Sequence, residues 1–149
     1  VLFRSPKFTI NDANGNKVKS TDFKGKKHVI YFYPKDFTPG CSTQADEFST
    51  DYKKFQNKDI EIIGISPDDV DSHKKFCEKM GIKYVLLADT EKEVSKAFDV
   101  WSMKKFMGRE YMGVTRSSFL VNEKGKIFKI YPKVKPAGHA KQVLEDFKK

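Results

Sequence analysis

The chain has 149 residues, 38% of them hydrophobic and 13% aromatic, which is enough for one domain, residues 1–149, around a full core. Its net charge of +9 comes from lysine pairs spread along the chain, which is typical of a solvated surface rather than of a nucleic-acid-binding arm. Because no nucleic-acid-binding motif accompanies these lysines, we expect no nucleic-acid partner. No segment approaches the roughly 20 apolar residues of a membrane helix, so we expect no membrane partner either.

The first part of the chain predicts a β-hairpin and then a buried central strand. Strand-like segments at 8–10 and 17–19 flank a polar turn. The apolar and aromatic run at 28–33 is typical of a strand that is covered on both faces, and Pro34 ends it. A loop with two further turn-forming residues, Pro39 and Gly40, comes next.

Strands and helices alternate in the middle of the chain. A helix with one apolar face is predicted by the spacing of Ala45, Phe48, Tyr52 and Phe55. Buried strands are predicted at 61–66 and 84–88, and a helix between them starts at 66–69 and stops at Gly81. A short helix capped by the residues at 89–90 follows the second of these strands.

The last third of the chain begins with a segment that has weaker signals of regular secondary structure. The segment 99–115 is expected to be irregular, with Trp101 as a packing residue or, alternatively, part of a substrate mouth. Two strands at 117–122 and 126–131 are joined by a tight turn, and a closing helix spans 136–147.

This order of elements predicts the α/β class. Strands that alternate with helices form a partly parallel sheet with helices on both faces, and the final hairpin adds antiparallel strands. The arrangement resembles the thioredoxin-like fold: a mixed central sheet flanked by helices, here with an N-terminal β-hairpin.

Two cysteines are too few for a secreted disulfide scaffold, so we expect a cytoplasmic protein in which they are structural or redox-active. With the three histidines they show no spacing typical of metal ligands, and we expect no metal and no cofactor. His73 and His139 are expected at the surface.

Cys41 is the candidate reactive residue. It follows a strand and a proline-containing loop and lies in the first turn of a helix, where the positive end of the helix favours a thiolate. Thr38 offers a hydroxyl three residues earlier. A thiolate in such a place can attack a peroxide oxygen and become a sulfenic acid. On these residues alone, Cys41 could equally be a small core residue.

The segment 31–41 resembles the active-site segment of peroxiredoxins. It carries their Pro-x-x-x-Thr-x-x-Cys motif at Pro34, Thr38 and Cys41, and its flanking residues are similar to the PrxQ subfamily, also called bacterioferritin comigratory protein. A second similar segment lies at 113–120, and the resemblance extends from Phe8 to the last helix.

The resemblance implies a role for each motif residue. Cys41 would be the peroxidatic thiolate, Thr38 would orient the peroxide, and Pro34 would shield the sulfur from water. Arg116 would lie beside the sulfur and stabilise its charge. Gln44 occupies a position that is often Glu in the subfamily, where it could still hydrogen-bond Arg116.

The resemblance also implies a resolving role for Cys77. The residue five positions after Cys41, a resolving cysteine in many PrxQ proteins, is Asp46 here, whereas Cys77 fits another branch of the subfamily. The resemblance implies thioredoxin or a similar dithiol as reductant, and a monomer. The alternative is a one-cysteine peroxidase in which Cys77 is structural.

Two further functions stay open at this stage. A thioredoxin-fold redox carrier without peroxidase activity would want Cys-x-x-Cys, but Cys41 is followed by Ser42, Thr43 and Gln44. A basic binding module with incidental cysteines is the other alternative. Thiol-dependent reduction of hydrogen peroxide and organic hydroperoxides is the function that we expect.

Overall fold

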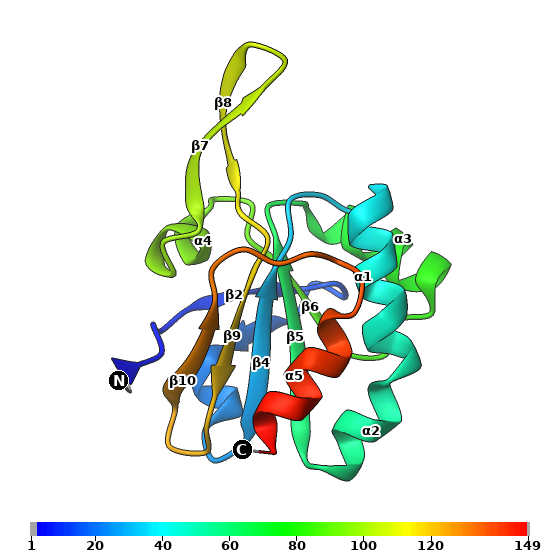
Figure 1. Cartoon of the computed structure of the whole chain (residues 1–149), viewed down its shortest axis with the longest axis vertical. Coiled ribbons are helices and arrows are strands. Elements are labelled where there is room, and N and C mark those ends of the chain that lie inside the picture. Colours follow the sequence, from blue (N-terminus) through cyan, green and yellow to red (C-terminus); the bar gives the residue numbers. More distant parts are fainter. Residues whose placement is uncertain (1–2, 149) are drawn as a thin grey trace.

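The structure is a computed structural model that describes residues 3–148, and its centre is an eight-stranded mixed sheet (Figure 1). The strands are β1 (Phe3–Arg4), β2 (Thr9–Asp12), β3 (Lys17–Lys19), β4 (Lys27–Phe32), β5 (Ile60–Ser66), β6 (Val85–Ala88), β9 (Ser117–Val121) and β10 (Lys126–Tyr131). The helices are the 3₁₀ turn η1 (Ser20–Phe23), α1 (Pro39–Thr50), α2 (Tyr52–Asn57), α3 (Val70–Met80), α4 (Glu93–Ala97) and α5 (His139–Phe147). The predicted α/β class with a mixed sheet and an N-terminal hairpin is confirmed.

The strands lie in the order β1-β10-β9-β4-β5-β6-β2-β3, with β4, β5 and β6 parallel at the centre. β9 runs antiparallel on the other edge of β4 and places Ser118 opposite Tyr31. The side chains of β4 from Val29 to Phe32 are at most 1% exposed. This burial explains the uninterrupted apolar run, because neighbours on both faces cover the strand.

Helices α1, α2, α3 and α5 cover one face of the sheet, and α4 packs on the opposite face (Figure 1). The chain steps from β4 to β5 and from β5 to β6 in the same direction through the sheet. Right-handed crossovers between parallel strands place successive helices on one side when the direction is kept. The helix that contains Cys41 and the helix that contains Cys77 therefore share a face.

Close packing against β5 positions α1. A Cβ atom at Gly64 would lie 2.7 Å from Cδ2 of Leu86 and 2.9 Å from Cζ of Tyr31. The Tyr31 ring stacks on Phe48 of α1 with 4.8 Å between centroids, and its hydroxyl hydrogen-bonds that of Tyr84 at 2.5 Å. Because residue 64 is a glycine, the rings of Tyr31, Phe48 and Tyr84 can pack closely there and hold α1 against the sheet.

Local signals define the helix ends. The Asp69 carboxylate accepts the N–H of Ser72 at 2.8 Å, and Gly81 ends α3 with φ 65°, so the predicted start and stop are confirmed. A break at Asp51 separates α1 from α2 within the predicted apolar face, and α5 starts at His139, a little later than predicted. Among the described residues, no helix is long and apolar enough to cross a membrane.

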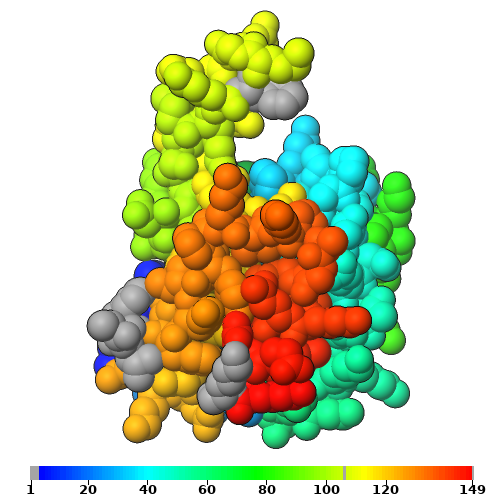
Figure 2. Space-filling model, in the orientation of Figure 1, coloured from blue at the N-terminus to red at the C-terminus, as the bar shows by residue number. Residues whose placement is uncertain are grey.

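The prediction of irregular structure at 99–115 is wrong. This segment forms an antiparallel hairpin of β7 (Trp101–Phe106) and β8 (Arg109–Val114), which stands out from one end of the molecule (Figures 1 and 2). Most of its side chains are exposed, so the sequence lacks the buried alternating face by which strands are recognised. Trp101 is partly buried against the core, with Lys92 Nζ 5.9 Å above its ring, which confirms its packing role.

Candidate active site

The first turn of α1 presents Cys41. Thr38 is the N-cap residue with an extended backbone, and Pro39 is the first residue of the helix. The Ser42 N–H donates to the Thr38 carbonyl at 2.9 Å and closes the turn around Cys41. Other amide groups at a helix start have no partner within the helix and carry its partial positive charge. Cys41 therefore lies at the positive end of α1, where it is 2% exposed.

Arg116 reaches Cys41 from the connection between β8 and β9. Its Nη2 lies 3.2 Å from Cys41 Sγ, and its Nη1 donates to Gln44 Oε1 at 2.7 Å. Since β9 pairs with β4, the sheet brings the residue that precedes β9 to the loop that follows β4. A guanidinium at this distance stabilises negative charge on sulfur. The expected hydrogen bond between Gln44 and Arg116 is present.

Gly40 provides the space that the guanidinium occupies, and the family resemblance assigned it no role. A Cβ atom at this position would lie 3.0 Å from Arg116 Nη2 and 3.3 Å from Pro136 Cγ. The loop after β10 also fixes the backbone of Arg116, because the Val134 N–H donates to the Arg116 carbonyl at 2.8 Å. Glycine is a poor helix former, so its presence in the first turn of a helix was a usable signal.

Thr38 and Pro34 lie in the loop between β4 and α1. The Thr38 hydroxyl donates to the Lys35 carbonyl at 2.8 Å, which leaves its oxygen lone pairs free to accept a hydrogen bond from a ligand. Thr38 is half-buried, and Pro34 is exposed. The structure thus places both residues at the solvent side of the turn that presents Cys41.

Gln44 is only partly satisfied in its buried position. Its side chain is 1% exposed, and among the described residues its Nε2 has no hydrogen-bond partner. A buried donor without a partner costs about 1–3 kcal/mol. A glutamate, which the resemblance places at this position, would meet Arg116 with a full charge and would leave no such donor.

Cys77 lies near the C-terminal end of α3, in an environment unlike that of Cys41. Both cysteines are free thiols, and Cys77 is half-buried against the same hydrophobic cluster that contains Cys41. Burial raises the pKa of the Cys77 thiol to about 11, with a smaller contribution from the charges of Asp36, Asp12 and Glu78. At neutral pH the folded protein therefore keeps Cys77 protonated.

The expectation that His73 and His139 lie at the surface is wrong, since they are 0% and 2% exposed. His139 Nε2 lies 2.7 Å from the Ser118 hydroxyl, and burial lowers the pKa of His139. His73 contacts Asp36 in the loop before α1. His73 shares a helical face with Phe76 and Met80, and this apolar spacing was the signal that it is buried.

Comparisons with known proteins identify the family of the chain. Residues 3–130 match the AhpC/TSA family. Peroxiredoxin Bcp of Bacillus subtilis is 43% identical over 145 residues, 97% of this chain and 92% of the relative. Peroxiredoxin Bcp of Escherichia coli K12 is 37% identical over 140 residues, with 94% and 90% covered.

Solved structures give the same result. The bacterioferritin comigratory protein of Xanthomonas campestris, for which alkyl peroxide reduction activity is described, superposes with a TM-score of 0.90 at 35% identity. The match covers 95% of this chain and 90% of that one. A PrxQ mutant of Xylella fastidiosa gives a TM-score of 0.91 at 31% identity, with 98% and 95% covered.

Proposed function

Because the chain belongs to the AhpC/TSA family and is a thiol-dependent peroxidase of the Bcp/PrxQ type, we propose that Cys41 is the sulfur that attacks the peroxide. The predicted family, thioredoxin-like fold and enzyme class are confirmed by these relatives. An enzyme of this family takes a peroxide substrate and a thiol reductant. The roles of single residues in this chain are the content of the proposal.

In the first step, the Cys41 thiolate attacks one oxygen of the peroxide. A sulfur–oxygen bond forms, the O–O bond breaks, and the other oxygen leaves as hydroxide or alkoxide and takes up a proton. The product is a sulfenic acid on Cys41 and water or an alcohol. The 3.2 Å contact between Arg116 Nη2 and Cys41 Sγ carries this assignment, because a fixed positive group stabilises charge that moves from sulfur to oxygen.

The loop before α1 completes the proposed site. The Thr38 hydroxyl, oriented by the Lys35 carbonyl, accepts a hydrogen bond from the peroxide and sets its direction of approach. Pro34 supplies an apolar wall without an N–H group and limits the access of water to the sulfur. Small hydroperoxides are the substrates that best suit a sulfur that is only 2% exposed.

In the second step, the Cys77 thiol attacks the sulfenic sulfur, which forms a disulfide and releases water. A disulfide needs Cα atoms about 5.5–6 Å apart. Both cysteines lie within helices in the reduced structure, so the first turn of α1 and the end of α3 have to unwind. A thioredoxin-like dithiol then reduces the disulfide. We also propose a monomer, on the resemblance alone, and a cytoplasmic location, on the small number of cysteines.

The second candidate is a one-cysteine peroxidase in which Cys77 is structural. The raised pKa of Cys77, about 11, and its half-buried position favour this candidate as long as α3 stays folded. In that case an external thiol would reduce the Cys41 sulfenic acid directly, with no disulfide inside the chain.

Peroxide consumption with a thioredoxin system tests the proposal in wild type, Cys41→Ser and Cys77→Ser. We expect Cys41→Ser to lose at least about 10³-fold, and Cys77→Ser to consume one equivalent of peroxide and then stop turning over with thioredoxin. Peptide mass spectrometry after one equivalent should find a 41–77 disulfide in the wild type. Activity that survives Cys41→Ser would rule out the assignment, and full turnover in Cys77→Ser would favour the one-cysteine candidate.

A further inference from the structure

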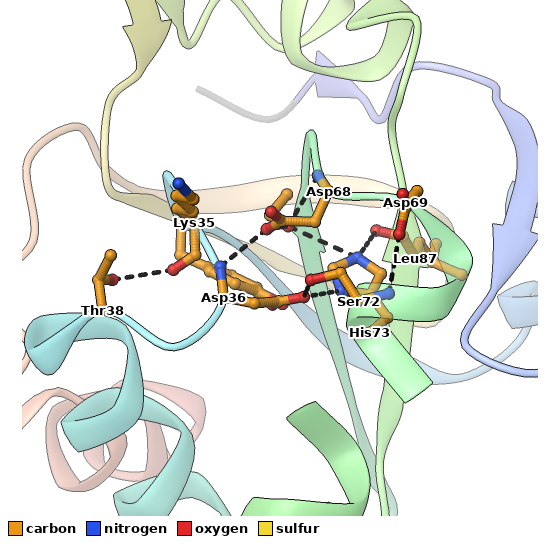
Figure 3. A network of polar contacts seen from close by, with 10 residues as sticks. Lys35, Asp36, Thr38, Asp68, Asp69, Ser72, His73 and Leu87 are labelled. Carbon is orange, nitrogen blue, oxygen red and sulfur yellow. Dashed lines mark hydrogen bonds and ion pairs between the residues drawn. The ribbon is translucent and has the colours of Figure 1, made fainter. Parts of the chain in front are cut away.

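Asp36 connects the loop that precedes α1 with the helix that carries Cys77 (Figure 3). Its carboxylate accepts hydrogen bonds from the Tyr33 hydroxyl at 2.7 Å and from the Ser72 hydroxyl at 2.9 Å. His73 Nδ1 lies 2.7 Å from the same carboxylate. The Asp36 N–H donates to Asp68 Oδ2 at 2.8 Å, so hydrogen bonds fix the backbone of this loop residue as well as its side chain.

His73 contacts an acceptor through each ring nitrogen. Nδ1 lies against the Asp36 carboxylate, and Nε2 lies 2.9 Å from the Leu87 carbonyl in β6. Asp36 is 3% exposed and His73 is fully buried, so water cannot replace these contacts when they break. A buried polar group that loses its partner costs about 1–3 kcal/mol, which makes the contact between the loop and α3 costly to break.

The same loop makes further contacts with α3. The rings of Phe37 and Phe76 meet edge to face with centroids 5.2 Å apart, and Lys79 Nζ lies 5.6 Å above the Phe37 ring. Thr38, the N-cap residue of α1, hydrogen-bonds the Lys35 carbonyl on the other side of Asp36 (Figure 3). On α3, the residues that make these contacts lie before and after Cys77 in the helix. On the loop, they lie immediately before the turn that presents Cys41.

We propose that Asp36 and His73 are positioning residues that hold the Cys41 turn and the Cys77 helix in the peroxide-reactive arrangement and so set the rate of disulfide formation. This inference rests on the proposed resolving role of Cys77. Because both helices must loosen before the sulfurs meet, a contact that joins them opposes the second step and preorganises the first. Breaking the contact then slows peroxide attack and speeds resolution.

A metal ion is a weaker explanation of this cluster. Ligand atoms of Asp36, Asp68 and His73 lie within 4.8 Å of one another. However, Asp68 Oδ2 already accepts from the Ser66 hydroxyl at 2.6 Å as well as from the Asp36 N–H. The atoms that would bind an ion are therefore engaged in hydrogen bonds among the loop, the end of β5 and the start of α3.

The test follows both steps in single turnovers of the full chain. Asp36→Asn keeps the shape of the side chain and removes its charge. We expect the 41–77 disulfide to form about tenfold faster than in wild type, and less Cys41 to become sulfinic acid in excess peroxide. Ser72→Ala removes one neutral donor and should give a change of about threefold in the same direction, which keeps the test usable if Asp36→Asn folds poorly.

Asp89→Asn is the matched control. The Asp89 carboxylate is also buried, and it accepts from Val94 N–H, Ser95 N–H and the Ser95 hydroxyl at 3.1, 2.8 and 2.7 Å, but at the start of α4, which carries no cysteine. We expect it to lower Tm and to leave both steps within about twofold of wild type. If disulfide formation were accelerated equally in Asp89→Asn, the effect of Asp36→Asn would be due to general destabilisation of the fold, and the inference would be wrong.

Two other results would overturn the inference, and they can be told apart. If wild type forms no 41–77 disulfide, the resolving role of Cys77 fails and the inference fails with it. If wild type forms the disulfide but Asp36→Asn and Ser72→Ala form it at the wild-type rate or slower, the positioning role alone is wrong.

Discussion

The two cysteines of this chain have opposite surroundings. Cys41 lies in the first turn of α1, with the Arg116 guanidinium 3.2 Å from its sulfur. Cys77 lies near the end of α3, where the helix dipole is negative and burial raises the pKa of the thiol to about 11. One thiol thus lies beside a fixed positive charge at the start of a helix, and the other is kept protonated by burial near the end of another helix.

This difference separates two kinds of reactivity. In the proposed mechanism, Cys41 meets its substrate in the folded protein, which calls for rigid and charged surroundings. Cys77 is proposed to act only after α3 loosens, and its folded surroundings keep its thiol protonated. Variants of the Cys41 site should therefore change the peroxide step, and conditions that release Cys77 should change the disulfide step.

The largest expected effect comes from removing the positive charge beside Cys41. Arg116→Met should lower the second-order rate of peroxide reduction by about 10²-fold, because the sulfur loses its fixed cation and Gln44 loses its partner. Single-turnover kinetics with hydrogen peroxide measure this rate. Arg109→Met, an exposed arginine on β8, is the control and should leave it unchanged. A loss of less than about threefold would show that the guanidinium is not needed.

For each pH unit, a smaller effect of about tenfold is expected in the disulfide step. Burial favours the protonated Cys77 thiol, so it stabilises folded α3 below the ordinary thiol pKa of about 8.5, and this contribution is lost as pH rises toward about 11. Disulfide formation should therefore accelerate from pH 6 upward, as the thiolate fraction grows.

The pH at which this acceleration ends distinguishes two routes. If unwinding of α3 is slower than attack by the solvated thiolate, the rate levels off at or below about pH 8.5. If Cys77 attacks from the folded helix, or from an unwound form in rapid equilibrium with it, the rise continues toward about pH 11. We expect the first result. A rate that does not change between pH 6 and pH 9 would contradict a resolving thiol in either state.

The smallest effect concerns the space beside Cys41. In Gly40→Ala the new methyl group would lie 3.0 Å from Arg116 Nη2 and displace it, so we expect a loss of about fivefold in the peroxide step. Asp46→Ala, an exposed change on the same helix, should have no effect. An unchanged rate in Gly40→Ala would mean that the guanidinium can shift without loss of function.

Most of the framework was predictable because it follows from local patterns. The buried run of β4, the apolar face of α1 and α2, and the Asp69 and Gly81 ends of α3 were all visible in the sequence. The hairpin of β7 and β8 was missed because exposed strands carry no apolar alternation on a buried face. A two-stranded arm gives too little burial to produce that signal.

The candidate site divides in a similar way. The resemblance named Cys41, Thr38, Pro34 and Arg116, and the structure brings Arg116 to the sulfur. The resemblance assigned no role to Asp36, Gly40 or His73, because the role of each depends on contacts between segments that are distant in the sequence. Asp36 and His73 lie 37 residues apart, and only the packing of α3 against the loop brings them together.

The direction in which the chain winds through its sheet sets a precondition for this chemistry. With β4, β5 and β6 in consecutive order, α1 and α3 come to rest on one side, and the two sulfurs border a common apolar layer. Had β6 been inserted beside the opposite edge of β4, the sheet itself would stand between them. No unwinding of a helix could then join them, so strand order decides which thiols can become partners before any local feature does.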